Sequence, residues 1–256
     1  MHMSEFAEKE FLVTGAAGGI GAAVARQLLQ AGGRVWCLDL PGAIKSAIGE
    51  LGVVGHAEPL PVDVSDETDV EKALETVAVA TNGVLHGLVN SAAIGGAYPF
   101  ESLTWADWER ELKVNVFGTY LTMRWCAPLL RSSGAGRIVN IASNAGKVPG
   151  PASAPYNASK AAVINLTRSA AKALAPEIAV NSICPGHVDT ALRSRFVEEA
   201  SGIIRDVDFD AAAASAQLGR PAQPEELADV VLFLLSSRSA FITGEDMNVN
   251  GGVLMF

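Results

Sequence analysis

The feature that most constrains the fold is a glycine-rich stretch, TGAAGGIG, at residues 14–21. It follows a β-rich run, EFLVTG, and opens a run with helical spacing, GIGAAVARQLLQAGG, which ends on the C-cap signal Gly32-Gly33. Gly15 allows a tight turn, and Gly19 and Gly21 allow close approach of a ligand and close helix packing. The amides at the helix start, including that of Ile20, favour pyrophosphate. The context predicts a dinucleotide site.

Short apolar runs alternate with amphipathic ones along the rest of the chain. A helix is predicted over 65–81, with Ser65 as its N-cap and Thr68 at the matching third position. Near-continuous Val/Ile/Leu strands between helices are typical of a parallel sheet covered on both faces. Strands after 10–15 are predicted at RVWCLDL (34–40), LPVDV (60–64), LHGLVNSA (85–92), GRIVNIAS (136–143), IAVNSICPG (178–186) and NVNGG (248–252).

These elements predict the α/β class: a single doubly wound (Rossmann) domain over 1–256, with a seven-stranded, mainly parallel sheet and helices on both faces. No Pro/Gly/Ser-rich linker or internal repeat divides the chain. Hydrophobic residues make up 49% and charged residues 18% of the sequence, which suits a packed enzyme and argues against disorder.

Charge and cysteine usage exclude several classes of function. A formal charge of −9 disfavours nucleic acid, and the apolar run VVLFLL is too short to span a bilayer. The N-terminus lacks the basic start and apolar run of a secretory signal. Cys37, Cys126 and Cys184 are odd in number and widely spaced, so we interpret them as reduced core thiols and predict no metal site. A cytoplasmic location is expected.

Asp39 ends the second predicted strand, twenty-four residues after Gly15. A carboxylate there can accept hydrogen bonds from both adenosine ribose hydroxyls and would repel a 2′-phosphate, whereas the nearby Gly18 and Leu40 are neutral. This favours NAD (NADH) over NADP. Asp63 and Val64, after the third strand, could receive the adenine edge; alternatively, Asp63 is a plain helix cap.

The stretch YNASK places Tyr156 and Lys160 four residues apart, on one face of a helix. A phenol has an ordinary pKa near 10, and an ammonium about 4 Å away could lower it by about three units at an effective dielectric of 20. The spacing therefore favours a base for alcohol oxidation, although chance alone gives such pairs in some chains.

The ordered set of motifs resembles the short-chain dehydrogenase/reductase family from about Phe11 to the C-terminus. The glycine turn, Asn90, Asn115, Ser143, YNASK and PGHVDT arrive in family order, and Tyr156 follows Ser143 by thirteen residues. Two departures stand out: the chain reads Asn-Ser-Ala-Ala at 90–93, where the family often has Asn-Asn-Ala-Gly, and Asn250 stands where Asp is common.

The resemblance implies the roles of the site residues. Tyr156 would be the acid/base, Lys160 would also hold the nicotinamide ribose, and Ser143 would bind the substrate oxygen. Asn115 would hold a water that relays protons; alternatively, it satisfies a helix irregularity, such as the kink that the family has there. Asn90 would contact the cofactor, and the nicotinamide would be flanked or bound by Pro185, Gly186, Val188 and Thr190.

The substrate should lie beyond the carboxyl ends of the strands, with tentative contacts from Ser143, Ala145, Val148, Tyr156 and His187. The segment 191–218 resembles the family's variable substrate lid. Polar substrate contacts are also conceivable for Lys147, Arg193 and Arg195, although each reads more simply as a solvated loop side chain. The apolar surfaces of the runs 114–130 and 156–174, helices that the family uses for assembly, favour a homotetramer, or else a homodimer.

The leading hypothesis is an NAD-dependent enzyme that interconverts a secondary alcohol and a ketone, with a small molecule as its partner. A 3-hydroxyacyl-thioester dehydrogenase or a 3-oxoacyl carrier-protein reductase is the alternative, although the latter usually takes NADPH and carries basic residues that this chain lacks. A nucleotide-binding regulator without chemistry fits less well, because Asn115, Ser143, Tyr156 and Lys160 are all present.

Overall fold

The structure, a computed structural model, describes residues 5–204, 211 and 216–255. Its seven strands form one sheet in the order β3-β2-β1-β4-β5-β6-β7, and every neighbouring pair is parallel. This confirms the predicted doubly wound α/β fold. The strands are β1 (Glu10–Thr14), β2 (Arg34–Asp39), β3 (Ala57–Pro61), β4 (Gly87–Asn90), β5 (Gly136–Ile141), β6 (Ile178–Pro185) and β7 (Asp246–Val249).

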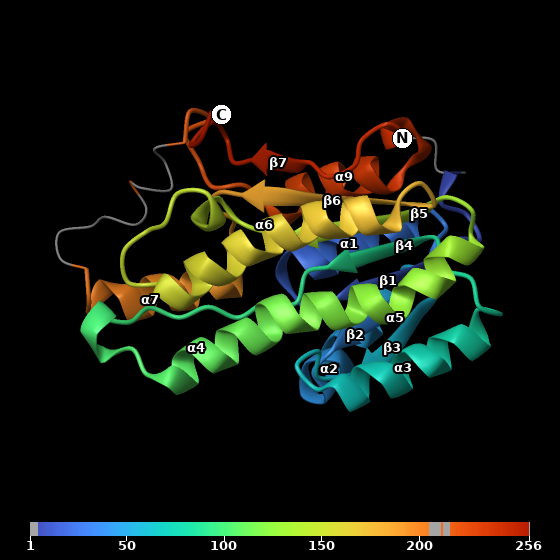
Figure 1. Ribbon diagram of the computed structural model, residues 1–256, viewed down its shortest axis with the longest axis horizontal. Coiled ribbons are helices and arrows are strands. Elements are labelled where there is room, and N and C mark those ends of the chain that lie inside the picture. The colour runs from blue at the N-terminus through green and yellow to red at the C-terminus, as the bar shows by residue number, and fades with distance from the viewer. Residues whose placement is uncertain (1–4, 205–210, 212–215, 256) are drawn as a thin grey trace.

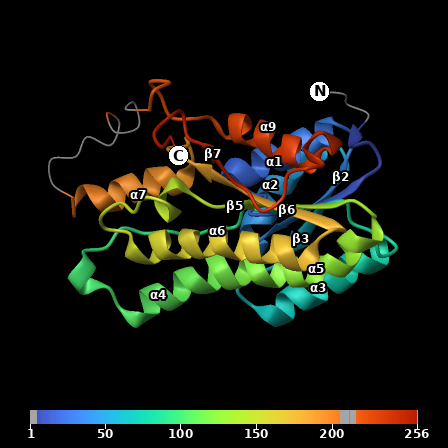
Figure 2. The ribbon, with the colours of Figure 1, turned by 45° about the horizontal axis from the view of Figure 1, so that its top comes forward.

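Helices cover both faces of the sheet (Figures 1 and 2). One face carries α1 (Gly19–Gln30), α2 (Pro41–Gly52) and α9 (Pro224–Leu235), and the other carries α3 (Glu67–Ala80), α5 (Thr119–Ser132) and α6 (Ala154–Leu174). Shorter helices are α4 (Trp105–Leu112), α7 (Ala191–Ser201), η2 (Phe100–Ser102), η3 (Lys113–Gly118), η4 (Asn144–Gly146) and η5 (Ser237–Ser239).

Alternation along the strands explains why the sheet has two cores. On β1, Phe11 and Val13 pack with the α1, α2 and α9 layer, whereas Leu12 between them packs with α3 and α5. Successive side chains of a strand point to opposite faces, so a continuous apolar run serves both layers. The sheet is therefore buried on both sides.

The third strand was predicted too late in the chain. It spans Ala57–Pro61 instead of 60–64 and pairs with β2 from Val35↔Ala57 to Asp39↔Pro61. As the edge strand, β3 tolerates two prolines and exposes Glu58, so it lacks the apolar run by which the other strands were found. The seventh strand likewise lies earlier, at Asp246–Val249 instead of 248–252.

The predicted N-cap of the helix over 65–81 was also wrong. The side chain of Asp66 accepts from the amides of Thr68 and Asp69, and the helix begins at Glu67. Ser65 instead donates from its hydroxyl and its amide to Asp63 Oδ1, at 2.7 and 2.9 Å. Its hydroxyl is therefore committed to the turn that precedes the helix.

The predicted helix over 114–130 is interrupted. A π-helical segment, η3, joins α4 to α5, so the three elements form one irregular rod that carries Asn115. In Figure 1, β6 and β7 point toward the side of the molecule where α7 lies. The carboxyl ends of the strands, where the candidate residues were predicted, therefore face α7.

Candidate active site

The strand order reverses between β1 and β4, and the glycine turn lies at this reversal. Thr14 Oγ1 accepts hydrogen bonds from the amides of Ser91 and Ala92, each at 3.0 Å. Gly15 has a φ of +66°, and a Cβ there would lie 2.8 Å from the Ala92 amide nitrogen. A side chain at Gly15 would therefore push apart the two loops that form the crevice.

The first amides of α1 have no side-chain cap. Gly19 has a φ of +53°, and a Cβ at Gly21 would lie 2.1 Å from the Gly15 carbonyl oxygen. The N-cap is Gly18, with no side-chain cap, and nothing lies within 4 Å of where its Cβ would stand. The first amides, that of Ile20 included, thus meet no capping side chain. Uncapped amides beside open space fit a pyrophosphate group.

Asp39 ends β2 and faces this turn. Its Oδ2 accepts from the Ala17 amide at 2.9 Å, and its Oδ1 accepts from the Leu40 amide at 2.8 Å. The carboxylate is half-buried, so it keeps capacity for further acceptance from a ligand. Asp39 therefore both braces the glycine turn and presents a negative charge beside it.

Three further residues predicted to contact the cofactor, Asp63, Val64 and Asn90, lie near β3 and β4. Asp63 accepts two hydrogen bonds from Ser65, and Val64 is buried against Gly118 of η3. Asn90 ends β4 and is 4% exposed; its Nδ2 donates to Asn140 Oδ1 at 2.9 Å. Its side-chain bonds lie inside the protein, so a cofactor contact from Asn90 would come from its backbone.

Asn115 is buried in η3 and links three elements. Its side chain pairs with both backbone groups of Ile94, accepting from the amide at 2.9 Å and donating to the carbonyl at 2.8 Å. Its Nδ2 also donates to Ser159 Oγ at 2.9 Å. The helix irregularity foreseen as an alternative role is present, and Asn115 fixes the loop after β4 to α6. Its water relay stays a prediction.

Ser143, Tyr156 and Lys160 converge beyond the end of β5. Ser143 precedes η4, and its side chain lies beside the Tyr156 phenol, where it lowers the pKa of that phenol. Lys160 Nζ lies 5.7 Å from the centroid of the Tyr156 ring and donates to the Ile141 carbonyl oxygen at 2.8 Å. The predicted pairing on one helical face is thus present, with the ammonium facing the ring.

The electrostatic consequence differs from the one predicted. Burial raises the pKa of the Tyr156 phenol to about 12, against the hydrogen bond from Ser143, and Glu111 raises it further. Burial also lowers the pKa of Lys160 to about 8. The expected lowering of the phenol pKa by Lys160 was therefore wrong for the protein alone, because desolvation outweighs an ammonium that is bound to Ile141.

The residues predicted around the nicotinamide follow β6. Pro185 ends this strand, and a Cβ at Gly186 would lie 3.1 Å from Asn250. Val188 is buried in the core, and Thr190 caps α7 while its methyl group faces Gly19. The segment after β6 therefore runs past the start of α1.

The tentative substrate residues are scattered. Ala145 is half-buried in η4, whereas His187 is exposed on the loop before α7 and Val148 is 49% exposed. Of the predicted lid, α7 is described, and residues 205–210 and 212–215 lie outside the described residues.

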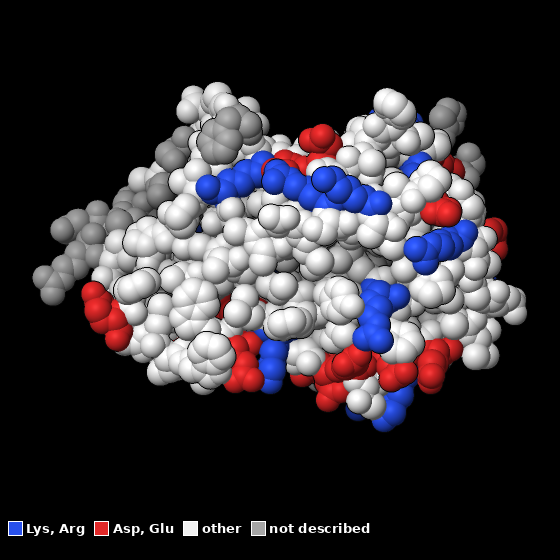
Figure 3. All heavy atoms as spheres, in the orientation of Figure 1, with Lys and Arg blue, Asp and Glu red and all other residues white. Residues whose placement is uncertain are grey.

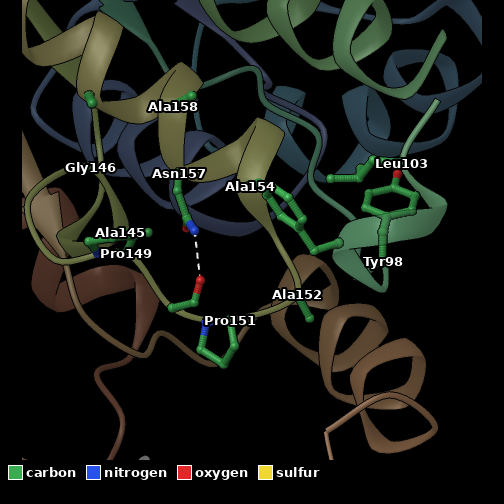
Figure 4. Close-up of a pocket in the computed structure, with 13 residues that line it drawn as sticks. Tyr98, Leu103, Ala145, Gly146, Pro149, Pro151, Ala152, Ala154, Asn157 and Ala158 are labelled. Atoms are coloured by element: carbon green, nitrogen blue, oxygen red, sulfur yellow. Dashed lines mark hydrogen bonds between the residues drawn. The ribbon is translucent and has the colours of Figure 1, made fainter. Parts of the chain in front are cut away.

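A cavity of ≈ 580 Å³ lies between the η4 turn, the first turns of α6 and the segment around η2 (Figure 4). Its α6 wall is formed by Ala154, Asn157, Ala158 and Ala161, with Asn157 Nδ2 donating to the Gly150 carbonyl oxygen at 2.8 Å. At about 100° per residue, Tyr156 and Lys160 lie on a different face of the helix. The cavity is lined by Ala145 and Gly146, which follow Ser143, but Ser143, Tyr156 and Lys160 are not part of its lining.

Comparison with known proteins places this geometry in a family. The model of the family described as "Enoyl-(Acyl carrier protein) reductase" matches residues 15–254. The chain is 38% identical to cis-4-hydroxycyclohexanecarboxylate dehydrogenase from Sinomonas cyclohexanicum, over 96% of this chain and 97% of that protein. The chain belongs to the short-chain dehydrogenase/reductase family. It is an oxidoreductase that acts on alcohol and ketone groups.

Solved structures of short-chain dehydrogenases/reductases match over nearly the whole chain. A 3-oxoacyl-[acyl-carrier protein] reductase from Brucella melitensis with bound NAD has a TM-score of 0.85 and 31% identity, covering 99% of this chain and 94% of that one. A variant of actinorhodin polyketide ketoreductase with NADPH has a TM-score of 0.90 and 32% identity, covering 96% and 97%. This chain is similar to both.

Sequence reasoning missed a buried polar network beneath the site of this dehydrogenase/reductase. Thr122 Oγ1 donates to Asn90 Oδ1 at 2.6 Å, Asn90 donates to Asn140, and Asn140 donates to Thr167 Oγ1 at 2.9 Å. All four side chains are buried. Asparagine inside two neighbouring apolar strands was the available signal, because a buried amide needs partners.

Lys147 was expected to be solvated or to contact substrate, and neither expectation was right. Its Nζ lies 2.7 Å from Asp246 Oδ2 and 2.6 Å from Asn248 Oδ1, both on β7. Arg168 of α6 also pairs with Asp246. These contacts fasten the η4 turn, which follows Ser143, to the end of the sheet.

Two kinds of feature are absent from the described residues. No group of three or more His, Cys, Asp or Glu side chains that could hold a metal ion occurs among them. Within the same residues, no helix has the length and apolar character needed to cross a membrane.

Proposed function

We propose that the protein interconverts a secondary alcohol and a ketone with NAD (NADH), using Tyr156 as the acid/base. The observation that carries the proposal is the convergence of Ser143 and Lys160 on the Tyr156 ring at the edge of the sheet that holds the glycine turn. A phenol that can exchange a proton with a substrate oxygen beside a dinucleotide site is what carbonyl reduction requires.

The residues divide the work by position. Ser143, beside the phenol, orients the substrate oxygen and stabilises its developing charge. With a pKa raised to about 12, Tyr156 is protonated at neutral pH and able to donate its proton to a ketone oxygen. Lys160, whose pKa is lowered to about 8, stays largely protonated there and keeps its ammonium over the ring.

A nicotinamide dinucleotide, when bound, supplies or accepts the hydride. Gly15, Gly19, Ile20 and Gly21 would cradle its pyrophosphate, since the α1 amides there have no side-chain cap. Asp39 would accept from the adenosine ribose, and Asp63 and Val64 would border the adenine. The segment from Pro185 through Gly186 and Val188 to Thr190 would lie along the nicotinamide, with Lys160 at its ribose. Asn115 would hold the relay water.

NAD is proposed over NADP because of Asp39. Its carboxylate faces the glycine turn, where a 2′-phosphate would meet a like charge. Similar solved structures hold NAD in one case and NADPH in another, so the preference rests on this residue alone.

The test is a panel of substrates with NAD(H) and NADP(H) side by side, followed by absorbance at 340 nm. Cyclohexanol, cis-4-hydroxycyclohexanecarboxylate, a polyol, an aromatic carbinol and their ketones cover the main classes. We expect turnover at least about tenfold faster with NAD(H). Tight NADH binding without turnover of any panel member would favour a regulator instead.

A second candidate is an acyl-thioester substrate, in either the 3-hydroxyacyl or the 3-oxoacyl form. It is favoured by the similarity to a 3-oxoacyl-[acyl-carrier protein] reductase whose solved structure holds NAD. Acetoacetyl-CoA with NADH tests it in the same panel. A kcat/KM for acetoacetyl-CoA well above that for every simple ketone would establish this alternative.

We also infer a single NAD-binding domain with a lid at about 191–218, assembled as a homotetramer (or homodimer) in the cytoplasm.

The proposed assembly is supported by the surface. Figure 3 shows a broad uncharged area on the face that carries α4, α5 and α6. Trp105, Phe117 and Tyr120 on the rod of α4, η3 and α5 are 80%, 57% and 45% exposed. Aromatic residues so exposed on one rod suit an interface with a second copy. The buried free thiols suit a reducing compartment.

A further inference from the structure

Glu111 is a buried carboxylate that the proposed mechanism does not use. It lies on α4 with 0% of its surface exposed, and its Oε1 accepts from the Gly96 amide at 3.1 Å. Within the described residues, its second carboxylate oxygen, Oε2, accepts no hydrogen bond of acceptable distance and angle. An apolar side chain would fill this position without the desolvation cost, so stability alone gives no reason for a carboxylate here.

The turn that Glu111 holds lies directly on the catalytic ring. A Cβ at Gly95 would stand 2.7 Å from Tyr156 Cδ2, so this glycine is in contact with the phenol ring. A Cβ at Gly96 would stand 2.4 Å from the Tyr98 hydroxyl oxygen. The turn is therefore packed between two tyrosines with no space for a side chain, and its position fixes one wall around Tyr156.

Two side chains of α7 form hydrogen bonds with the same turn. Arg195 Nη2 on α7 donates to the Gly95 carbonyl oxygen at 2.7 Å, and Glu199 Oε2 accepts from the Ala97 amide at 3.1 Å. Arg195 and Glu199 also pair with each other at 3.4 Å. Glu111 of α4 and the two side chains of α7 thus contact three consecutive residues, Gly95–Ala97.

We propose that Glu111 is a positioning residue: by accepting from the Gly96 amide it seats the turn Gly95–Ala97 on the Tyr156 ring and fixes the platform to which α7 is fastened. This inference rests on the proposed role of Tyr156. Glu111 itself touches neither substrate nor cofactor in this scheme.

The charge of Glu111 adds a pH dependence. Burial raises its pKa to about 7, against the Gly96 amide, Arg110 and Tyr98, while Asp107 raises it further. Glu111 in turn raises the pKa of the Tyr156 phenol on α6. Lys160 lies over the Tyr156 ring, and Arg195 and Glu199 of α7 contact the turn.

The sign for stability follows from this raised pKa. The folded protein binds the Glu111 proton more tightly than the unfolded chain, so its contribution favours folding at low pH and is lost as pH rises from the ordinary value of 4.5 through about 7. Glu111→Gln should therefore raise the melting temperature at pH 8 and leave it nearly unchanged at pH 5. An acid whose pKa is lowered on folding would give the reverse.

The test compares three variants of the full chain. Glu111→Gln keeps an acceptor without charge, Glu111→Leu removes the acceptor, and Glu109→Leu changes an exposed acid on the same helix. Should Leu at this buried position prevent folding, Glu111→Met replaces it. Hydrogen exchange of the Gly96 amide should quicken at least about tenfold in Glu111→Leu, stay within about threefold in Glu111→Gln, and not change in Glu109→Leu.

Two further measurements distinguish a positioning role of Glu111 from a role in stability alone. Nitration of Tyr156 by tetranitromethane, followed by peptide mass spectrometry, should quicken several-fold in Glu111→Leu without any substrate. With the best substrate of the panel, kcat should fall at least about tenfold in that variant while the KM for NAD stays within twofold, and Glu111→Gln should restore it.

Unchanged exchange at Gly96, or unchanged nitration of Tyr156, in Glu111→Leu overturns the proposal. So does a wild-type kcat in that variant. If the wild-type protein turns over nothing in the panel, the proposed function fails, while exchange and nitration still decide whether Glu111 seats the turn on the ring.

Discussion

Lys160 Nζ lies 5.7 Å from the centroid of the Tyr156 ring and is hydrogen-bonded to the Ile141 carbonyl oxygen at the end of β5. The lysine is thus held by the sheet and faces the aromatic ring. Nearly complete burial lowers the pKa of Lys160, and burial raises the pKa of the Tyr156 phenol. The protein alone therefore holds a protonated tyrosine beside a cation.

Replacing Tyr156 by Phe tests the acid/base assignment. The ring and its contacts with Gly95 remain, so we expect unchanged folding and NADH affinity but a loss of about three orders of magnitude in kcat. Stopped-flow absorbance and NADH fluorescence titration measure the two quantities. Tyr120→Phe, at a 45% exposed tyrosine of α5, is the matched control and should keep most activity; turnover retained by Tyr156→Phe would reject the assignment.

Asp39→Asn tests the cofactor preference. The amide oxygen can still accept from the Ala17 amide, so the glycine turn should survive while the negative charge is lost. We expect the ratio of kcat/KM for NAD over NADP to fall about tenfold, equivalent to about 1.4 kcal/mol. Asp63→Asn removes a different carboxylate charge and should leave this ratio unchanged. An unchanged ratio in Asp39→Asn would mean that another residue selects the cofactor.

Thr122→Val tests the buried network under the site. The substitution keeps the shape but leaves Asn90 Oδ1 without the hydroxyl that donates to it at 2.6 Å. An unpaired buried acceptor costs about 1–3 kcal/mol, so unfolding in urea should occur at lower denaturant. Thr76→Val, at an exposed threonine of α3, should change little; equal effects of the two would contradict the network's role.

Asp246→Asn tests the clamp on the η4 turn. Burial is the largest single influence and pushes the pKa of Asp246 up, but the hydrogen bonds from Lys147 and Arg168 together outweigh it and lower the pKa below 3.8. A lowered pKa stabilises the fold above the ordinary value, and this stabilisation disappears as pH falls through the folded value.

The wild-type protein should therefore exceed Asp246→Asn by about 1–3 kcal/mol at pH 7, with the gap closing below about pH 4. Urea unfolding at several pH values measures this difference. A gap that stays constant down to pH 3 would show that the charge of Asp246 is not responsible.

Phe117→Asp tests the proposed assembly. A charge in the centre of the exposed aromatic surface should break the interface, so light scattering after size exclusion should report a smaller species than the wild type. Val53→Asp, at an 88% exposed valine near the end of α2, is the control and should leave the mass unchanged. A wild-type mass for Phe117→Asp would place the interface elsewhere.

The sequence alone determined the fold and the members of the site, because both depend on local pattern and on position along the chain. Apolar runs between helical stretches predict a parallel sheet, and residues that end such strands meet at one edge. Gly15 and Asp39 could be placed on that reasoning, whereas Tyr156 was found by its spacing to Lys160 and Ser143 by the family resemblance. The edge strand β3 escaped it, since half-exposed residues such as Glu58 do not follow the buried pattern.

Only the tertiary structure decided what each side chain contacts and how strongly it holds a proton. Lys160 was expected to acidify the phenol, yet its pKa and that of Tyr156 follow from desolvation, which depends on everything packed around them. Glu111 and Gly96 are fifteen residues apart, and Arg195 reaches Gly95 across a hundred. Such contacts arise from the packing of helices on the sheet, which no local spacing encodes.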